Sequence, residues 1–242
     1  MKYLDLGQAR RTTSTAVDLA APGFFGKESS MRIPTKMCAV AAAATLLLLF
    51  LLIAPAVSQQ EAGAPAAGPQ KAGLPVLLTS CGQSPGPTRF EIFFKSLKLD
   101  YVSKMNATAA DITAKAKTGV PFKSVIIVTG ASLKGMGAAG VSIEDEIARI
   151  KALIAEAKKQ NVKVIGAHVE GMARRAQGAA PGDNSDELTI DAVCPFASLL
   201  IVKKEGDEDG RFTTISKGKN IPMLAFEKNM DLENVLKDLF SK

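Results

Sequence analysis

Glycine-rich loops that follow short apolar runs hold many of the side chains able to do chemistry. Two of these loops are CGQSPGP (Cys81 to Pro87) and GASLKGMGAAG (Gly130 to Gly140). Main-chain N–H groups in such loops, together with hydroxyl and basic side chains, suit a phosphate or a carboxylate. The alternative is a tight turn that needs glycine only for its positive φ.

A third loop, within GAHVEGMARR, contains His168, the only histidine of the chain, and the paired arginines Arg174 and Arg175. Paired guanidinium groups offer bidentate donors to an anion, and the alternative is that they are solvated at the surface. His168 is a candidate acid or base, with a buried, hydrogen-bonded histidine as the alternative. One histidine cannot build a histidine-rich metal site, and the nearby carboxylates have no recognised ligand spacing, so we expect no metal.

Cys81 ends an apolar run just before a predicted helix, a position that can lower a thiol pKa and create a nucleophile. Arg89 lies too far along the chain for a C-x5-R phosphatase signature, and there is no C-x-x-C motif. Cys194 precedes its strand whereas Cys81 follows one. We therefore expect two free, buried thiols at opposite edges of the sheet, too far apart for a disulfide.

The spacing of Gly135, Gly137 and Gly140 matches the G-x-G-x-x-G pattern of dinucleotide sites. Gly135, however, comes five residues after Gly130 instead of directly after the strand, and no acidic residue ends the next strand. We therefore expect no nicotinamide or flavin cofactor.

The apolar runs that must position these groups are short and nearly continuous: LPVLLTS, YVSKM, SVIIVTG, VKVIGAHV, SLLIVKK and IPMLAF. Their spacing fits βαβ crossovers, and their continuity is typical of a parallel sheet covered on both faces. We predict a three-layer, doubly wound α/β fold, flavodoxin-like or Rossmann-like, with about six mainly parallel strands.

The clearest helix pattern runs from Ile143 to Gln160, where Ser142 and Asp145 form a capping box. The other predicted helices are Thr88 to Leu97, Ala109 to Lys117, Ser185 to Val193, Arg211 to Lys217 and Leu232 to Phe240.

In such folds ligands bind beyond the carboxyl ends of the strands, where the winding reverses. For a flavodoxin-like order this point lies between the first and third strands, which the two glycine-rich loops follow. The predicted ligand-binding residues are Gln83, Ser84, Gly130, Ser132, Lys134, Gly135, His168, Arg174, Arg175, Ser185 and Asp186.

Met37 to Val57 is apolar and uncharged, with Arg32 and Lys36 before it, as in a membrane-directed segment. Two outcomes stay open: cleavage after Ser58 as a signal peptide, with Met31 as an alternative start, or retention as a membrane anchor. Either outcome predicts a C-terminal domain outside the cytoplasm, periplasmic, secreted or membrane-anchored. We assign 1–36 to an N-terminal tail, 37–57 to the signal or anchor helix, 58–73 to a disordered linker and 74–242 to one α/β domain.

The net charge of +6 overstates the basicity of this domain. Half of the excess charge belongs to residues 1–58, and aromatic residues are not interleaved with the lysines and arginines. We therefore expect no nucleic-acid partner.

Several long motifs together resemble a family of exported bacterial proteins known only as a domain of unknown function: TSCGQSPG, IIVTGASLKGMGAAGVSIEDEIARI, GAHVEGMARR, NSDELTIDAVCPFASLLIVKK and DGRFTTISKGKNIP. The likeness spans about Leu74 to Phe240 and implies no established activity. The family pattern has a small residue in place of Cys81 and a G-G-E-A-R-R-like run at positions 170–175. Four residues match the family pattern, and the resemblance favours them as site residues: Ser132, Lys134, Arg174 and Arg175.

We therefore predict a small-molecule binding module that takes an anionic ligand, a carboxylate or phosphate compound, between the loops of Gln83, Lys134 and Arg174. The first alternative is an enzyme of phosphoryl or acyl transfer that uses Cys81 or His168. The second is a scaffold that docks an envelope or transporter protein through its loops.

Overall fold

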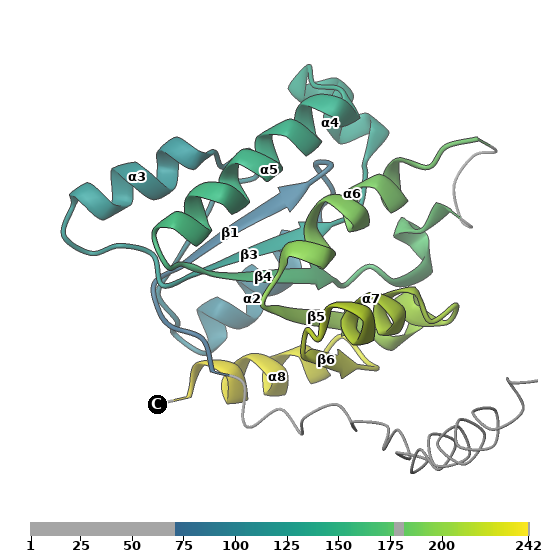
Figure 1. The fold of residues 1–242 in the computed structure, drawn as a ribbon. Coiled ribbons are helices and arrows are strands. Elements are labelled where there is room, and N and C mark those ends of the chain that lie inside the picture. The colour runs from purple at the N-terminus through teal and green to yellow at the C-terminus, as the bar shows by residue number, and fades with distance from the viewer. Residues whose placement is uncertain (1–70, 177–181, 242) are drawn as a thin grey trace, which may run out of the picture. The chain divides into compact units, whose positions relative to one another are not determined.

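A computed structural model describes residues 71–176 and 182–241, which contain a six-stranded sheet (Figure 1). The strands all run parallel, in the order β2-β1-β3-β4-β5-β6. The predicted flavodoxin-like winding is therefore confirmed, and it reverses between β1 and β3. The strands are β1 (Val76–Cys81), β2 (Tyr101–Ser103), β3 (Ser124–Thr129), β4 (Lys163–His168), β5 (Leu199–Lys203) and β6 (Met223–Phe226).

Helices cover both faces of the sheet, which gives the predicted three layers (Figure 1). On one face lie α3 (Ala109–Lys117), α5 (Ile143–Lys159), α6 (Ser185–Val193) and α7 (Arg211–Lys219). On the other lie α2 (Pro87–Ser96) and α8 (Asp231–Phe240). Because both faces are covered, every residue of β1 and β3 is buried, which explains why their sequences are nearly continuous apolar runs.

Helix α5 begins as its capping box predicts. The Ser142 side chain accepts a hydrogen bond from Asp145 N, and the Asp145 side chain accepts one from Ser142 N. The box satisfies main-chain donors that the helix itself leaves without partners. The helix then buries Ile150, Leu153 and Ile154 against the sheet.

The loop expected from Gly130 to Gly140 instead contains a short helix, α4 (Leu133–Ala139). Ser132 caps it by accepting a hydrogen bond from Gly135 N, and Gly140 ends it with a φ of 66°. The glycine content argued against a helix, but the N-cap at Ser132 and the C-cap at Gly140 outweigh the poor helix propensity of the residues between them.

Within 71–176 and 182–241 there is no helix long and apolar enough to cross a membrane. The predicted membrane segment, Met37 to Val57, lies outside the described residues, as do the tail, the linker up to residue 70 and the alternative start at Met31.

Aromatic rings hold α2 and α8 to the sheet. The Phe94 ring is fully buried and meets Phe90, Tyr101 and Phe240 edge-on, at centroid distances of 6.1, 5.1 and 5.9 Å. Such edge-to-face contacts add to the free energy gained from burying the rings. Phe94 therefore links α2, β2 and the last residue of α8.

We predict that Phe94→Ala lowers the free energy of unfolding by about 3 to 5 kcal/mol, because it removes a fully buried ring and leaves a cavity. Urea denaturation followed by circular dichroism measures this change. The control is Ile92→Ala on the same helix, where the side chain is 64% exposed. That variant should change stability by less than about 0.5 kcal/mol, and equal losses in the two variants would contradict the proposed role of the cluster.

Candidate functional site

The loops that leave β1 and β3 are in direct contact at the point where the winding reverses. Gln83 and Ala131 form an isolated antiparallel bridge, and Ser132 N donates a hydrogen bond of 2.7 Å to Gly82 O. Gly82 has a φ of 92°, and a Cβ there would stand 2.7 Å from Gly130 O. Only glycine allows so close an approach of the two backbones.

Two carboxylates from neighbouring helices accept the buried main-chain donors of these loops. Gly82 N donates to Glu146 Oε2 at 2.9 Å, and Ala131 N donates to Asp186 Oδ1 at 2.6 Å. Gly130 N donates to Thr189 Oγ1 at 2.9 Å. Acidic side chains of α5 and α6 therefore hold the strand ends in place, and Asp186, predicted as a ligand-binding residue, has a structural partner.

Arg149 stabilises this arrangement through three contacts. It donates to the carbonyl oxygens of Ser80 and Ala107, both at 2.6 Å, and pairs with Glu146 at 2.7 Å. Burial alone would raise the pKa of Glu146, but the hydrogen bonds from Arg149 and Gly82 N outweigh it and hold that pKa below its ordinary value. The sequence analysis did not predict Glu146 or Arg149 as part of this site. The pattern that could have indicated them is an acidic and a basic residue three positions apart on a helix that packs on the sheet.

Arg174 crosses the end of β3. Its Nη1 donates to Ala131 O at 2.8 Å, and its Nε lies 3.4 Å from Glu170 Oε1. The aliphatic part of the side chain packs on Gly130, where a Cβ would stand 3.1 Å from Arg174 Cβ. The side chain is 26% exposed, and Nη2 has no hydrogen-bond partner among the described residues. Arg174 therefore presents fixed donors at the rim.

Two carboxylates, those of Glu170 and Asp186, interact with the charge of this guanidinium. The Glu170 side chain is 9% exposed, and its Oε2 has no hydrogen-bond partner in the part of the chain that the structure describes. Burial raises the pKa of Asp186, an effect that Ala131 N and the nearby charge of Arg174 partly offset. The positive charge at this rim is therefore closely balanced by negative charge.

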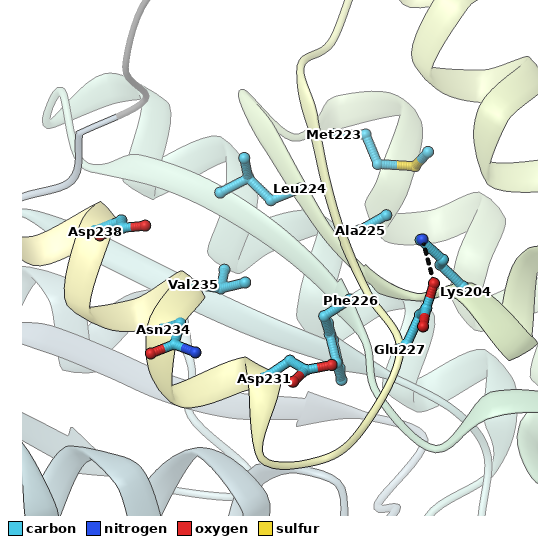
Figure 2. A pocket seen from close by; sticks show the side chains of 10 residues that line it. All are labelled: Lys204, Met223, Leu224, Ala225, Phe226, Glu227, Asp231, Asn234, Val235 and Asp238. Carbon is cyan, nitrogen blue, oxygen red and sulfur yellow. Dashed lines mark hydrogen bonds and ion pairs between the residues drawn. The ribbon is translucent and has the colours of Figure 1, made fainter.

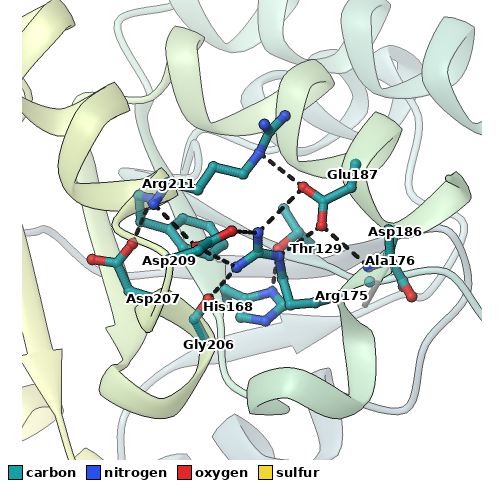
Figure 3. Close-up of polar contacts among 12 residues, drawn as sticks. Thr129, His168, Arg175, Ala176, Asp186, Glu187, Gly206, Asp207, Asp209 and Arg211 are labelled. Carbon is teal, nitrogen blue, oxygen red and sulfur yellow. Dashed lines mark hydrogen bonds and ion pairs between the residues drawn. The ribbon is translucent and has the colours of Figure 1, made fainter. Parts of the chain in front are cut away.

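Arg175 points inward instead, as Figure 3 shows. Its side chain is 2% exposed and pairs with Glu187 Oε1 at 2.7 Å and Asp209 Oδ2 at 2.5 Å, and it also donates to Gly206 O. The guanidinium carbon lies 5.6 Å from the centre of the Phe212 ring. All of its N–H groups have acceptors, so the structure leaves Arg175 no donor for the predicted anion.

His168 is fully buried below this ion pair cluster (Figure 3). Its Nε2 lies 3.0 Å from Gly171 O, which can only accept, so Nε2 carries the proton. Nδ1 lies 3.1 Å from Thr129 Oγ1. Burial lowers the pKa of His168 to about 4, and the neutral ring has no solvent-facing nitrogen. The buried, hydrogen-bonded alternative is therefore the one observed.

The two described cysteines are free and buried, as predicted. Burial raises the pKa of Cys81 to about 12, and the Glu146 carboxylate adds to the effect. The expected separation at opposite edges of the sheet is wrong. Both thiols lie in one apolar cluster, close enough for a charge on Cys81 to raise the pKa of Cys194. The reason is that α6 is short: Val193, next to Cys194, lies over Gly166 in the middle of β4.

The remaining predicted residues divide between the rim and internal roles. Gln83 is partly exposed, and Lys134 is exposed on α4. Ser84 is fully buried, and its N–H donates to Ser80 Oγ. Ser185 is buried and donates to Asp183. Gly135 packs against Gln83, with Gln83 O 2.5 Å from where a Cβ would stand.

Within the described ranges, no three His, Cys, Asp or Glu side chains come together as metal ligands would. The predicted loops meet at the rim, and among the described residues only Arg174 provides a charged donor there that hydrogen bonds hold in place.

The low pKa of His168 makes stability depend on pH. The unfolded histidine takes up a proton below about pH 6.5, whereas the folded one does so only near pH 4, so acid favours the unfolded chain. We predict a loss of about 3 kcal/mol between pH 6.5 and 4 from this residue. His168→Gln cannot titrate, so its free energy of unfolding should fall less over this range. Parallel pH profiles for the two proteins would contradict the assignment.

The neighbouring arginines should differ in their effect on stability. Arg175→Met leaves Glu187 and Asp209 without their buried partner, and we expect a loss of about 3 kcal/mol. Arg174→Met removes one ion pair of 3.4 Å between side chains that are 26% and 9% exposed, and it should cost less than Arg175→Met, which removes two shorter pairs. Thermal and urea denaturation of the two variants checks this order, and the reverse order would contradict it.

Similarity to solved structures is weak. A GDSL-like lipase from Bacteroides thetaiotaomicron is 17% identical with a TM-score of 0.29, and the match covers 62% of this chain and 66% of the lipase. A psychrotrophic esterase from Pseudoalteromonas sp. is 12% identical with a TM-score of 0.28, over 62% of this chain and 76% of the esterase. These similarities are too low to bear on the chemistry of the rim. No curated protein gives a significant match.

A family model is more informative. The model described as a domain of unknown function, DUF6305, matches residues 73–240. This range nearly coincides with the one over which the loop motifs resemble such a family. Because the match covers well over half of the chain, this protein belongs to the DUF6305 family.

Proposed function

We propose that the domain binds a small carboxylate compound at the carboxyl ends of β1, β3 and β4. The observation that carries the proposal is the Arg174 guanidinium, which Ala131 O and Glu170 fix in place while no described residue accepts from Nη2. A preorganised guanidinium loses little freedom when it binds a planar anion. The reversal of the sheet winding at this rim supports the same location.

The charge around Arg174 favours a carboxylate over a phosphate. The carboxylates of Glu170 and Asp186 interact with the charge of the guanidinium. Lys134, on α4, is an exposed positive charge. A doubly charged phosphate monoester would meet more repulsion from these two carboxylates than a singly charged carboxylate would. The buried Cys81 and His168 give no comparable support to phosphoryl or acyl transfer.

The proposal includes a location outside the cytoplasm, with Met37 to Val57 as a signal peptide or a membrane anchor. Its support is the uncharged apolar sequence preceded by Arg32 and Lys36. A domain placed there meets external organic acids, which fits a binding module for carboxylates.

The test is a thermal-shift and calorimetric screen of the purified protein against millimolar monocarboxylates, dicarboxylates and phosphate monoesters. We predict that at least one carboxylate raises the Tm and that Arg174→Gln weakens its binding by about 10- to 100-fold, the effect of losing charged hydrogen bonds. Arg174→Lys keeps the charge but not the planar fork of donors. Its carboxylate affinity should therefore lie between that of the unmodified protein and that of Arg174→Gln.

The matched control is Arg89→Gln, because Arg89 is a surface arginine whose partner is Asn229. Its carboxylate affinity should equal that of the unmodified protein. The proposal fails if no carboxylate raises the Tm, or if Arg174→Gln gives the same shift.

A further inference from the structure

A hollow of about 490 Å³ lies along the outer edge of the sheet, away from the strand-end rim (Figure 2). Strand β6 forms one side of it, and helix α8 forms the other. Its lining includes half-buried Leu224 and Val235, which give it an apolar floor. The shape is that of a groove running beside a strand.

The strand beside this groove has an open hydrogen-bonding edge. β6 is the last strand of the sheet and pairs only with β5 among the described strands. Leu200 N donates to Pro222 O, so Pro222 and Leu224 turn their main-chain groups toward β5. By the alternation of a strand, the N–H and C=O groups of Met223 and Ala225 point outward. Ala225 is also exposed and small, so its side chain does not cover them.

The walls of the groove are mainly acidic. Asp231 and Asp238 lie on the same side of α8, two turns or about 10 Å apart. Glu227 lies at the end of β6, where it pairs with Lys204 at 2.6 Å. After this pairing Asp231 and Asp238 are the remaining charged side chains of the lining, and Lys71, whose Nζ donates to Asp238 O at 3.2 Å, partly offsets the charge at that end. The net negative charge complements a cationic occupant.

We propose that this groove binds an extended, basic segment of a partner polypeptide by strand addition to β6. The main chain of the segment pairs with Met223 and Ala225. Its lysines or arginines point to the α8 side, where their aliphatic stems contact Leu224 and Val235 and their charges face Asp231 and Asp238. Its apolar side chains alternate with them and lie on the other face, beside Met223 and Ala225. In strand addition, main-chain hydrogen bonds supply affinity and alternate side chains supply specificity. A strand partner also satisfies edge groups that otherwise face water.

The experiment measures fluorescence anisotropy of a labelled heptapeptide, KVKVKVK, titrated with the purified protein. We expect a Kd in the micromolar range that rises with salt, because the charged contacts are screened. The peptide EVEVEVE, of opposite charge, should bind at least about tenfold more weakly. KPKPKPK keeps the charge but lacks N–H groups at alternate positions, and it should also bind at least about tenfold more weakly.

Variants separate the main-chain contribution from that of charge. Ala225→Pro removes an outward N–H without removing a bond to β5 and should weaken KVKVKVK binding about tenfold. Ala225→Val keeps the N–H and serves as its control. Asp238→Lys should weaken binding about three- to tenfold, whereas Asp100→Lys, an exposed aspartate just before β2 at the opposite edge, should not.

Any one of the following results would overturn the proposal. Equal binding of KPKPKPK and KVKVKVK, or no effect of either groove variant, would mean that only general charge attraction operates. No binding of KVKVKVK at millimolar protein would exclude a basic strand. A homodimer in sedimentation that Ala225→Pro dissociates would identify a second copy of this chain as the occupant. Thermal denaturation of each variant verifies folding, and Asp238→Lys gives a test that does not depend on the proline variant.

Discussion

The close contact between the β1 and β3 loops sets the conditions for the rest of the strand-end rim. Gly82, Gly130 and Ala131 bring main-chain N–H groups into a buried space, where each needs an acceptor. Glu146, Asp186 and Thr189 supply these acceptors from α5 and α6. Buried acids need compensation in turn, and Arg149 provides it for Glu146. Most polar groups at the rim are therefore used to hold the loops together.

This use of polar groups explains why two adjacent arginines have different roles. Arg175 follows the 3-10 turn Gly171–Arg174 and reaches inward to Glu187 and Asp209, which tie the start of α6 to the start of α7. Arg174, one residue earlier, lies along Gly130 and ends at the surface. Two arginines that are adjacent in the sequence therefore differ in role: Arg175 forms a structural ion pair, and Arg174 is a candidate ligand contact.

The sheet was predictable from the sequence because its strands are buried on both faces and read as apolar runs, as VLLTSC and SVIIVT show. Helix α5 was predictable from its capping box. Helix α4 was not, since its residues favour a loop and only the cap at Ser132 and Gly140 decides. The burial of Arg175 was not predictable either, because its partners lie 12 and 34 residues away and only the fold brings them together. For the same reason the sequence could not separate a site residue from a structural one at Asp186.

Main-chain groups are used differently at the strand-end rim and at the β6 edge. At the rim, side chains from within the molecule already accept the buried N–H groups, so a ligand there must be held mainly by a side chain, and Arg174 is the one positioned for it. Along β6 the internal pairing stops at β5, and the outward groups of Met223 and Ala225 have no strand beyond them in the described chain. The opposite edge strand, β2, is one residue shorter than β6. The rim therefore suits a small molecule bound by side-chain charge, whereas the β6 edge suits a chain bound through its backbone.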